Sequence, residues 1–271
     1  MFIKAKDCRM HRNLYVLMRD GIKLATSVFL PIEDGSYPVV LIRSAYNRVF
    51  SYDPYFPLNG IALVVQDCRG RYESEGEFYP FVNEADDGYD TLEWIGSQSW
   101  CNGYVGMLGD SYLAATQLFL APTQNKYLKV LNPRFMAGDC WKQAYYSSGV
   151  FSLALTWSWF CFEVASKVSH ASELPLLDVE TTLKHLPINE LDEVCGAGEV
   201  SYYRDYVKHQ SYDSFWRELS IRDSYNHFNM PVLLTGGWYD YYPNETIENF
   251  NGLISNALSP ELAKSHRMII G

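Results

Sequence analysis

The stretch that decides the fold is Val105-Gly106-Met107-Leu108-Gly109-Asp110-Ser111-Tyr112-Leu113-Ala114-Ala115-Thr116-Gln117. It predicts a short apolar strand, a tight turn that carries a serine, and the start of a helix rich in small residues. Such an elbow holds a serine hydroxyl clear of the backbone, near the positive end of a helix. Leu113 stands where the Gly-x-Ser-x-Gly pattern has its second glycine. The local pattern therefore leaves two interpretations open for Ser111, a nucleophile or an ordinary helix N-cap.

The composition is that of a folded protein with a substantial core. Of 271 residues, 48% are hydrophobic and 20% are charged, which suits one large domain or a domain with a sizeable insertion. Aromatic residues reach 15% and indicate aromatic-lined surfaces or pockets beyond the needs of a core. The net charge of −10 argues against a nucleic-acid partner, which would need a basic face.

The cysteine pattern and the lack of long apolar segments indicate the cellular compartment of the protein. Six cysteines are scattered along the chain without a Cys-x-x-Cys pair. The usual zinc spacings are absent, so we expect free thiols in a reducing compartment and no metal ion. Residues 1–7 show no secretory signal, and the apolar run 150–162 is too short to cross a membrane. The sequence thus predicts a soluble cytoplasmic protein without membrane contact.

The pattern along the chain predicts strands that alternate with helices. Asp20-Gly21 between two apolar runs predicts a β-hairpin over residues 14–30. Further strands are expected at 38–43, 61–67, 127–132, at the start of 231–240 and at 267–271, with helices at 83–95, after Ser111 and at 244–258. This alternation implies an α/β fold, with a mainly parallel, doubly wound sheet and helices on both faces.

The alternation stops in an aromatic stretch with a helical pattern. We interpret 1–134 as the first part of an α/β core, 135–225 as an inserted helical cap, and 226–271 as the second part of the core, incomplete at its C-terminal end. The cap either lines a substrate pocket or forms a second packing domain without one. The residues leave both interpretations open.

Several polar side chains fall at the carboxyl ends of the expected strands, where functional residues of open α/β sheets gather. Tyr46, Asp67, Ser111 and Asp240 all occupy that edge in this interpretation. A serine followed much later by an aspartate is also the chain order of the α/β-hydrolase triad, which continues to a histidine.

Motifs spread over nearly the whole chain match one known family. They are Arg19-Asp20-Gly21, Arg43-Ser44-Ala45-Tyr46-Asn47, Gln66-Asp67-Cys68-Arg69-Gly70, Ser74-Glu75-Gly76-Glu77-Phe78, Trp100-Cys101-Asn102-Gly103-Tyr104-Val105-Gly106-Met107, Gly109-Asp110-Ser111-Tyr112 and Gly236-Gly237-Trp238-Tyr239-Asp240. The chain resembles the cocaine esterase / X-Pro dipeptidyl-peptidase family of serine hydrolases, which has the α/β-hydrolase fold. The family's elbow is Gly-x-Ser-Tyr-x-Gly, so Leu113 fits it, although Ala114 replaces the usual glycine.

The resemblance implies roles for matching residues. Ser111 corresponds to the nucleophile, and Asp240 to the acid that orients the catalytic histidine. The Tyr46 hydroxyl and the backbone N–H of Tyr112 correspond to the oxyanion hole, and no metal or organic cofactor is implied. The structural alternatives are a loop aromatic for Tyr46 and a helix N-cap for Asp240. Cap aromatics wall the acyl pocket in the family, and Tyr145, Trp159 and Phe160 fall near those positions.

We expect Asp67 and Arg69, also in a matching motif, to form an internal ion pair that shapes their loop rather than to take part in chemistry.

The catalytic histidine of the family follows the last strand in a Gly-Pro-Trp-x-His segment, and the chain reaches only its first residue, Gly271. The C-terminal β-rich domain of the family lies beyond that point as well. His266 precedes the last strand, so we expect it roughly 15 Å from the active edge, at the wrong end. The other histidines have no motif behind them; they are His11, His170, His185, His209 and His227.

The resemblance therefore implies a serine hydrolase acting on a small-molecule ester or amide, either a carboxylesterase or an X-Pro or acyl-peptidase-like enzyme. The isolated chain would be inactive, and a separate C-terminal segment or subunit would supply the histidine. The aromatic cap suggests a hydrophobic or aromatic acyl group. The alternative is a truncated, non-catalytic remnant that serves as a binding or structural module.

Overall fold

The computed structural model describes residues 8–168 and 178–271, which form two units. The first unit contains the described residues up to Gly138 together with Ile221–Gly271, and the second contains Asp139–Ser220. Two predictions lie outside the described residues: the lack of a secretory signal in residues 1–7, and the lack of a role for His170.

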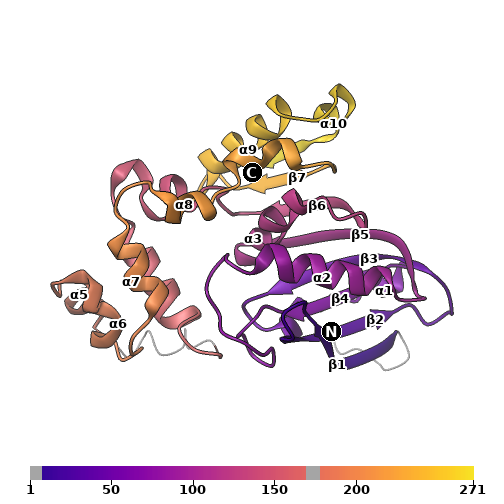
Figure 1. Cartoon of the computed structure of the whole chain (residues 1–271), viewed down its shortest axis with the longest axis horizontal. Helices are drawn as coiled ribbons and strands as arrows, with labels where there is room; N and C mark the ends of the chain where they lie inside the picture. The colour runs from indigo at the N-terminus through magenta and orange to yellow at the C-terminus, as the bar shows by residue number, and fades with distance from the viewer. Residues whose placement is uncertain (1–7, 169–177) are drawn as a thin grey trace. The chain divides into compact units, whose positions relative to one another are not determined.

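The described strands of the first unit form one eight-stranded sheet with the order β1-β2-β4-β3-β5-β6-β7-β8 (Figure 1). Their bounds are β1 Arg9–Leu17, β2 Lys23–Leu30, β3 Tyr37–Ser44, β4 Ala62–Asp67, β5 Cys101–Asp110, β6 Leu128–Arg134, β7 Leu233–Gly236 and β8 Arg267–Ile270. β2 runs antiparallel to β1 and β4, and the pairs from β4–β3 to β7–β8 are parallel. The predicted α/β fold with a mainly parallel sheet is confirmed.

Local sequence explains the hairpin and the core. Gly21 adopts φ +89° in the predicted turn, and its N–H donates to the Met18 carbonyl at 2.9 Å. Every residue of β4 is buried, as the apolar run over its first four residues predicts for a strand covered on both faces. Ile42 and Leu63 of neighbouring strands belong to one buried apolar cluster.

Along the chain, the helices of the first unit each lie between two strands. They are α1 Tyr55–Leu58, α2 Glu84–Gly96, α3 Tyr112–Leu120, α9 Pro243–Ser255 and α10 Pro260–Ser265, with short 3-10 turns η1 Arg48–Ser51, η2 Ala121–Thr123 and η8 Arg222–His227. α2 carries acidic residues in its first turn, which complement the helix dipole. Asn83 is its N-cap by position, but the Asn83 side chain makes no capping bond. α3 contacts β3, β5 and β6, while α9 contacts β7 and β8.

The second unit is helical in its described residues. Its segments are η3 Cys140–Tyr145, η4 Ser147–Gly149, α4 Leu153–Ser158, η5 Trp159–Glu163, α5 Val179–Thr182, η7 Ile188–Glu190, α6 Leu191–Val194, α7 Ser201–Lys208 and α8 Ser214–Glu218. Aromatic rings form its core, because the Tyr206 ring lies within 4.8 Å of the rings of Tyr145, Phe160 and Trp216. Edge-to-face contacts of this kind stabilise a core beyond the area they bury.

The second unit is narrower than the predicted cap of 135–225. The Phe135 N–H donates to the Thr235 carbonyl at 2.9 Å, so the chain directly after β6 still pairs with β7. The Ile221 N–H donates to the Gly138 carbonyl at 2.8 Å. The insertion therefore leaves and rejoins the first unit at hydrogen-bonded neighbours, which the sequence pattern does not reveal.

Across residues 8–168 and 178–271, we find no helix with the length and apolar character that crossing a membrane requires.

Candidate active site

Ser111 lies at the sharp turn between β5 and α3, as the elbow pattern predicts. Its backbone adopts φ 55° and ψ −125°, a conformation that residues with a side chain rarely adopt. The Ser111 N–H donates to the Arg134 carbonyl at 3.0 Å, which ties the turn to β6. The side chain is exposed and makes no capping hydrogen bond to α3. Ser111 thus holds the N-cap position, but its hydroxyl does not act as a cap.

Gly109 explains how so tight a turn is accommodated. A Cβ at this position would lie 2.4 Å from Cβ of Leu113, on the first turn of α3. Only glycine therefore lets β5 approach the helix this closely. Leu113 stands at the position where the common elbow pattern has its second glycine. Packing therefore links Leu113 to Gly109.

Tyr46 reaches Ser111 from the neighbouring strand. It follows β3, and its hydroxyl lies 3.1 Å from Oγ of Ser111. β3 and β5 are paired in parallel, so their carboxyl ends meet at one edge of the sheet. The structure therefore brings together two of the predicted site residues.

The Tyr112 side chain is committed to the core rather than to the surface beside Ser111. Its hydroxyl donates to Oε1 of Glu84 at 2.8 Å and accepts from the Phe81 N–H at 2.8 Å. Burial and, next, the Glu84 carboxylate raise the pKa of the Tyr112 phenol well above its ordinary value. The predicted role of Tyr112 concerns its backbone N–H at the start of α3, and that role stays a prediction.

Asp240 lies in the loop after β7. α9 begins at Pro243 with Tyr242 as N-cap, so Asp240 is not the cap of that helix. Oδ2 of Asp240 is buried and has no hydrogen-bond partner among the described residues. A buried carboxylate oxygen without a donor is costly, so this atom is a natural acceptor for a group such as an imidazole N–H.

Gly271 lies beside the loop that carries Asp240. Its carbonyl accepts from the Trp238 N–H at 3.0 Å, and its N–H donates to the Gly236 carbonyl at 3.2 Å. The polypeptide at Gly271 is therefore at the same carboxyl edge of the sheet as Asp240.

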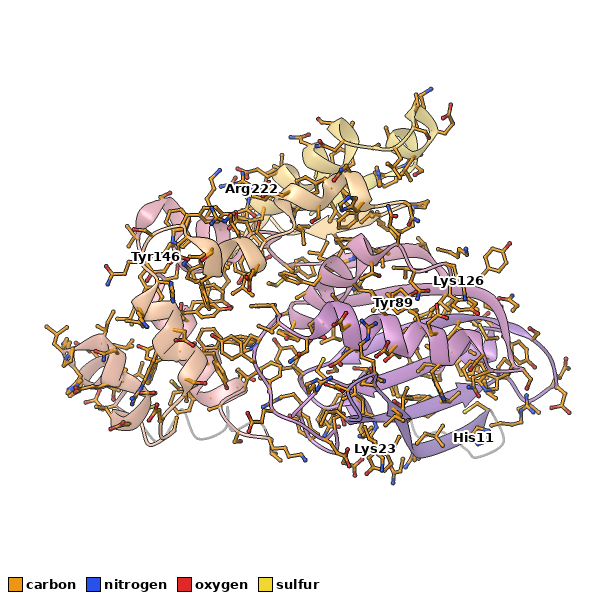
Figure 2. All side chains as sticks on the ribbon, viewed as in Figure 1. His11, Lys23, Tyr89, Lys126, Tyr146 and Arg222 are labelled. Carbon is orange, nitrogen blue, oxygen red and sulfur yellow. The ribbon has the colours of Figure 1, made fainter. Side chains whose placement is uncertain are left out.

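The described histidines are placed apart from this edge or engaged elsewhere. His266 directly precedes β8, so that strand separates it from Gly271, as predicted. It is buried, its ring nitrogens have no hydrogen-bond partner among the described residues, and burial lowers its pKa. His11 is exposed on the edge strand β1 (Figure 2). In the second unit, His209 contacts Asp213 at 2.6 Å and His185 contacts Glu190 at 3.4 Å.

The predicted pocket aromatics lie within the second unit. Tyr145 and Phe160 are buried and stack on each other with ring centroids 5.5 Å apart. Trp159 is half-buried, with its ring centroid 5.0 Å from that of Phe160. Their role in binding an acyl group stays a prediction.

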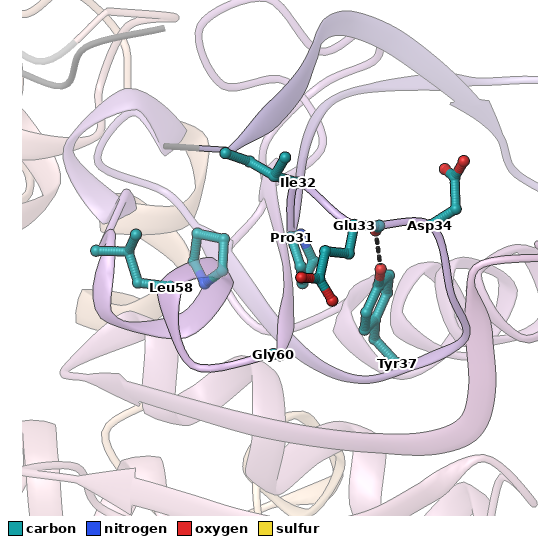
Figure 3. A pocket seen from close by; sticks show the side chains of 8 residues that line it. Pro31, Ile32, Glu33, Asp34, Tyr37, Leu58 and Gly60 are labelled. Carbon is teal, nitrogen blue, oxygen red and sulfur yellow. Dashed lines mark hydrogen bonds between the residues drawn. The ribbon is translucent and has the colours of Figure 1, made fainter. Parts of the chain in front are cut away.

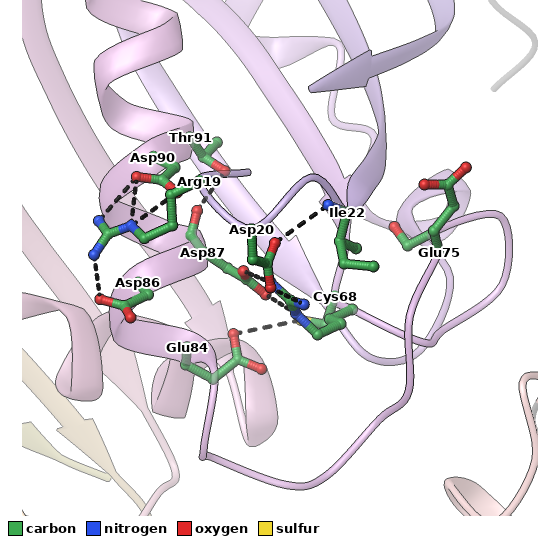
Figure 4. Close-up of polar contacts among 12 residues, drawn as sticks. Arg19, Asp20, Ile22, Cys68, Glu75, Glu84, Asp86, Asp87, Asp90 and Thr91 are labelled. Carbon is green, nitrogen blue, oxygen red and sulfur yellow. Dashed lines mark hydrogen bonds and ion pairs between the residues drawn. The ribbon is translucent and has the colours of Figure 1, made fainter. Parts of the chain in front are cut away.

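The predicted ion pair between Asp67 and Arg69 is wrong. Asp67 instead accepts from the backbone N–H of Arg48 at 2.6 Å and pairs with the Arg48 guanidinium. Arg69 pairs with Asp87 at 2.6 Å and with Asp20 at 2.6 Å, and both acids are labelled in Figure 4. Asp67 ends β4 and Arg69 lies in the loop after it, and each has a partner far away in sequence.

Sequence reasoning missed Arg48 and Arg71 as residues that support the site. Both are buried. Arg48 belongs to the loop that carries Tyr46 and binds Asp67, and Arg71 donates to the Ala45 carbonyl of the same loop. Their position close to matching motifs was the only signal, since a buried arginine cannot be told from an exposed one by residue type.

The first unit also contains a cavity of about 400 Å³, whose lining is drawn in Figure 3. It is formed where β2 ends and where β3 and β4 begin, so it is at the opposite end of the parallel strands from the elbow. Its lining consists of Pro31, Ile32, Glu33, Asp34, Tyr37, Pro57, Leu58 and Gly60. It contains none of the predicted site residues.

Among the described residues, no group of three or more His, Cys, Asp or Glu side chains is arranged to hold a metal ion.

Comparison with known proteins gives a family match and close structural neighbours. Residues 20–271 match the X-Pro dipeptidyl-peptidase (S15) family. The chain is 32% identical to the cocaine esterase of Rhodococcus sp. (strain MB1 Bresler) over 268 residues, which covers 90% of this chain and 46% of that protein.

Two solved structures share the fold over the whole chain. One is an aminopeptidase from a marine sediment archaeon, Thaumarchaeota archaeon, with TM-score 0.80 and 21% identity. The other is an α-amino acid ester hydrolase, with TM-score 0.79 and 21% identity. The match covers 100% of this chain and 49% of each neighbour. The chain thus spans about half the length of these relatives.

Proposed function

The chain belongs to the X-Pro dipeptidyl-peptidase (S15) family, and we propose that it is the nucleophile-bearing part of a serine hydrolase that cleaves esters or amides. The observation that carries this proposal is the elbow, where an exposed Ser111 hydroxyl is 3.1 Å from the Tyr46 hydroxyl. A strained turn of this kind persists when its surroundings hold it, and such strain is common at catalytic residues.

In the proposed mechanism, Oγ of Ser111 attacks the carbonyl carbon of the substrate while a histidine takes the hydroxyl proton. The carbonyl oxygen becomes an oxyanion, which accepts hydrogen bonds from the Tyr46 hydroxyl and the Tyr112 N–H. The leaving alcohol or amine takes the proton from the histidine, and an acyl group stays on Ser111. Water then attacks the carbonyl carbon of the acyl-enzyme while the histidine takes its proton. The bond to Oγ of Ser111 breaks, Oγ regains a proton from the histidine, and the carboxylic acid is released.

The histidine is proposed to lie outside these 271 residues, on a segment that continues from Gly271 or on a separate chain. Two observations support this. Oδ2 of Asp240 is buried without a hydrogen-bond partner among the described residues, and Gly271 hydrogen-bonds the neighbouring Gly236 and Trp238. A segment passing this point could place an imidazole against Asp240.

The proposed substrate is a small molecule with a hydrophobic or aromatic acyl group, and no cofactor takes part. The aromatic composition of the second unit supports this choice, with Tyr145, Trp159 and Phe160 as the proposed pocket residues. A cytoplasmic location is proposed on the free thiols alone.

Hydrolysis assays test the proposal. Aliphatic and aromatic p-nitrophenyl esters and X-Pro anilides are offered to the chain, alone and with an added segment carrying Gly-Pro-Trp-x-His. Activity should appear with the segment and disappear in Ser111→Ala and Asp240→Asn. The control variant Ser97→Ala should keep the activity, because Ser97 is an exposed serine at the C-cap of α2. A folded protein that cleaves no substrate in either form would instead be a binding or structural module.

A further inference from the structure

The loop that carries Tyr46 is held along its backbone by a second loop. We call residues 44–48 the tyrosine loop and residues 67–71, which begin at the last residue of β4, the clamp segment. Three hydrogen bonds join the clamp segment to the tyrosine loop. Before Tyr46, the Cys68 N–H donates to the Ser44 carbonyl at 2.9 Å, and Nε of Arg71 donates to the Ala45 carbonyl at 2.8 Å. After Tyr46, Oδ1 of Asp67 accepts from the Arg48 N–H at 2.6 Å. Tyr46 is therefore bracketed by contacts on both sides.

Asp67 makes the closest of these contacts and is completely buried, with 0% of its surface exposed. One carboxylate oxygen accepts from the backbone of Arg48, and the other pairs with the Arg48 guanidinium, which is itself buried. Hydrogen bonds to an ionised group in such surroundings are shorter and stronger than neutral ones. Asp67 therefore fixes the position of the backbone two residues after Tyr46.

The backbone between Tyr46 and Arg48 has an unusual conformation that needs such support. Asn47, between Tyr46 and Arg48, has φ +80°, a region that residues other than glycine rarely adopt. A residue in this conformation persists only where its surroundings determine it. The Asn47 side chain supports this conformation from one side, because its Oδ1 accepts from the Val49 N–H at 3.0 Å. The Asp67 contact with the Arg48 N–H supports it from the other.

The clamp segment is itself anchored to the rest of the first unit. Arg69 pairs with Asp87 of α2 at 2.6 Å and with Asp20 in the hairpin turn at 2.6 Å (Figure 4). A Cβ at Gly70 would lie 2.2 Å from the Phe78 backbone nitrogen, which shows how closely the chain folds back here. The clamp segment can therefore act as a rigid support.

We infer that Asp67 is a positioning residue, which holds the tyrosine loop so that the Tyr46 hydroxyl stays beside Ser111. The inference rests on the proposed function, in which Tyr46 donates to the oxyanion. Asp67 does not touch the reacting atoms; it acts through the backbone of Arg48. Displacement of a reacting or stabilising group by a fraction of its contact distance is costly in rate.

A kinetic double-mutant cycle tests the inference. It uses the chain together with the added segment that carries Gly-Pro-Trp-x-His, the form in which we expect ester hydrolysis. Tyr46→Phe should lower kcat about 100-fold or more. Asp67→Asn keeps the shape but places an amide N–H₂ against one of the two Arg48 donors, and it should lower kcat about 10-fold or more with little change in KM. In the Tyr46→Phe background, Asp67→Asn should have no further effect on kcat, because it acts through the missing hydroxyl. Equal effects in both backgrounds would overturn the inference.

The matched control is Asp192→Asn in the second unit. Asp192 is also 0% exposed, and it also accepts from a backbone N–H, that of Val200 at 2.8 Å, and from an arginine, Arg204, at 2.8 Å. Both variants should lose stability, but only Asp67→Asn should lower kcat in a manner that depends on Tyr46. If both lowered it alike, the effect of Asp67 would be one of general stability.

A spectroscopic readout separates this inference from the proposed function. 3-Fluorotyrosine is placed at position 46, and its ¹⁹F chemical shift is compared before and after Ser111→Ala. The shift should respond to Ser111→Ala in the otherwise unchanged protein and should no longer respond in Asp67→Asn. An undiminished response would contradict the inference even in an inactive chain. Conversely, normal kcat in Tyr46→Phe would contradict the proposed oxyanion role alone.

Should Asp67→Asn not fold, Ser44→Ala takes its place. Oγ of Ser44 accepts from the Tyr46 N–H at 3.0 Å, so this smaller change loosens the same loop. It should weaken the ¹⁹F response and lower kcat only while Tyr46 is present, and an unchanged response would count against the inference.

Discussion

The Tyr46 hydroxyl lies 3.1 Å from Oγ of Ser111, although the two residues are 65 positions apart in the chain. The contact depends on parallel pairing of β3 with β5, which brings the loop after one strand to the elbow after the other. An oxyanion that forms on a substrate bound to Ser111 would lie within reach of the same phenol.

Removal of this hydroxyl should therefore slow the chemical step. We expect Tyr46→Phe to lower kcat by about 10²- to 10³-fold, the usual effect of losing one oxyanion donor, with KM nearly unchanged. Steady-state hydrolysis of a p-nitrophenyl ester measures both constants. A rise in KM at constant kcat would assign Tyr46 to substrate binding instead.

The elbow should not tolerate a side chain at Gly109. Gly109→Ala would bring Cβ to 2.4 Å from Cβ of Leu113 and should lower the free energy of unfolding by about 1–3 kcal/mol. Urea unfolding measures the loss. The double variant with Leu113→Gly, which removes that Cβ, should be less destabilised than the sum of the two single changes, because the clash is relieved. Simple additivity would show that the two positions do not interact.

The buried ion pair beside the elbow should matter far more than a pair on the surface. Arg43 is 0% exposed and its Nη1 lies 2.5 Å from Oε2 of Glu84. Glu84→Gln should lower the free energy of unfolding by about 3–5 kcal/mol, since the guanidinium loses its nearest carboxylate in a buried site. Glu180→Gln, which breaks the exposed pair with Lys184, serves as control and should change little. Similar losses in the two variants would contradict this account.

His266 should make stability depend on pH. Burial lowers its pKa in the folded state below the ordinary 6.5. The unfolded chain therefore takes up a proton near pH 6.5 while the folded state resists it. Stability should be full above pH 6.5, fall as the pH drops below that value, and level off beneath the folded pKa.

Urea unfolding between pH 5.5 and 7.5 measures this slope. His266→Leu should flatten it, whereas His11→Leu, at an exposed position on β1, should not. An unchanged slope in His266→Leu would show that other groups cause the dependence.

The strands of the core could be predicted from sequence because their apolar runs are long and unbroken. β4 is buried at every position, and the Asp20-Gly21 turn forms the hairpin that it predicts. The limits of the insertion could not be predicted to the residue. Phe135 still pairs with β7 and Gly138 with Ile221 through backbone groups, and these bonds do not depend on residue type.

The site could be predicted only in part. The resemblance indicated Ser111 and Tyr46, and the structure brings them together. The partner of Asp67 was predicted wrongly, because proximity in sequence suggested Arg69 while the fold supplies Arg48 from another loop. Pairing of buried charges depends on which loops meet, and one sequence carries little information on that.

Labelling with a fluorophosphonate probe tests most directly whether Ser111 is a nucleophile that a histidine outside these 271 residues activates. The chain is treated alone and with an added segment carrying Gly-Pro-Trp-x-His, and the labelled peptide is identified by mass spectrometry. We expect label on Ser111 only when the segment is present, and none in Ser111→Ala. Label on another residue, or an equal rate without the segment, would contradict the account.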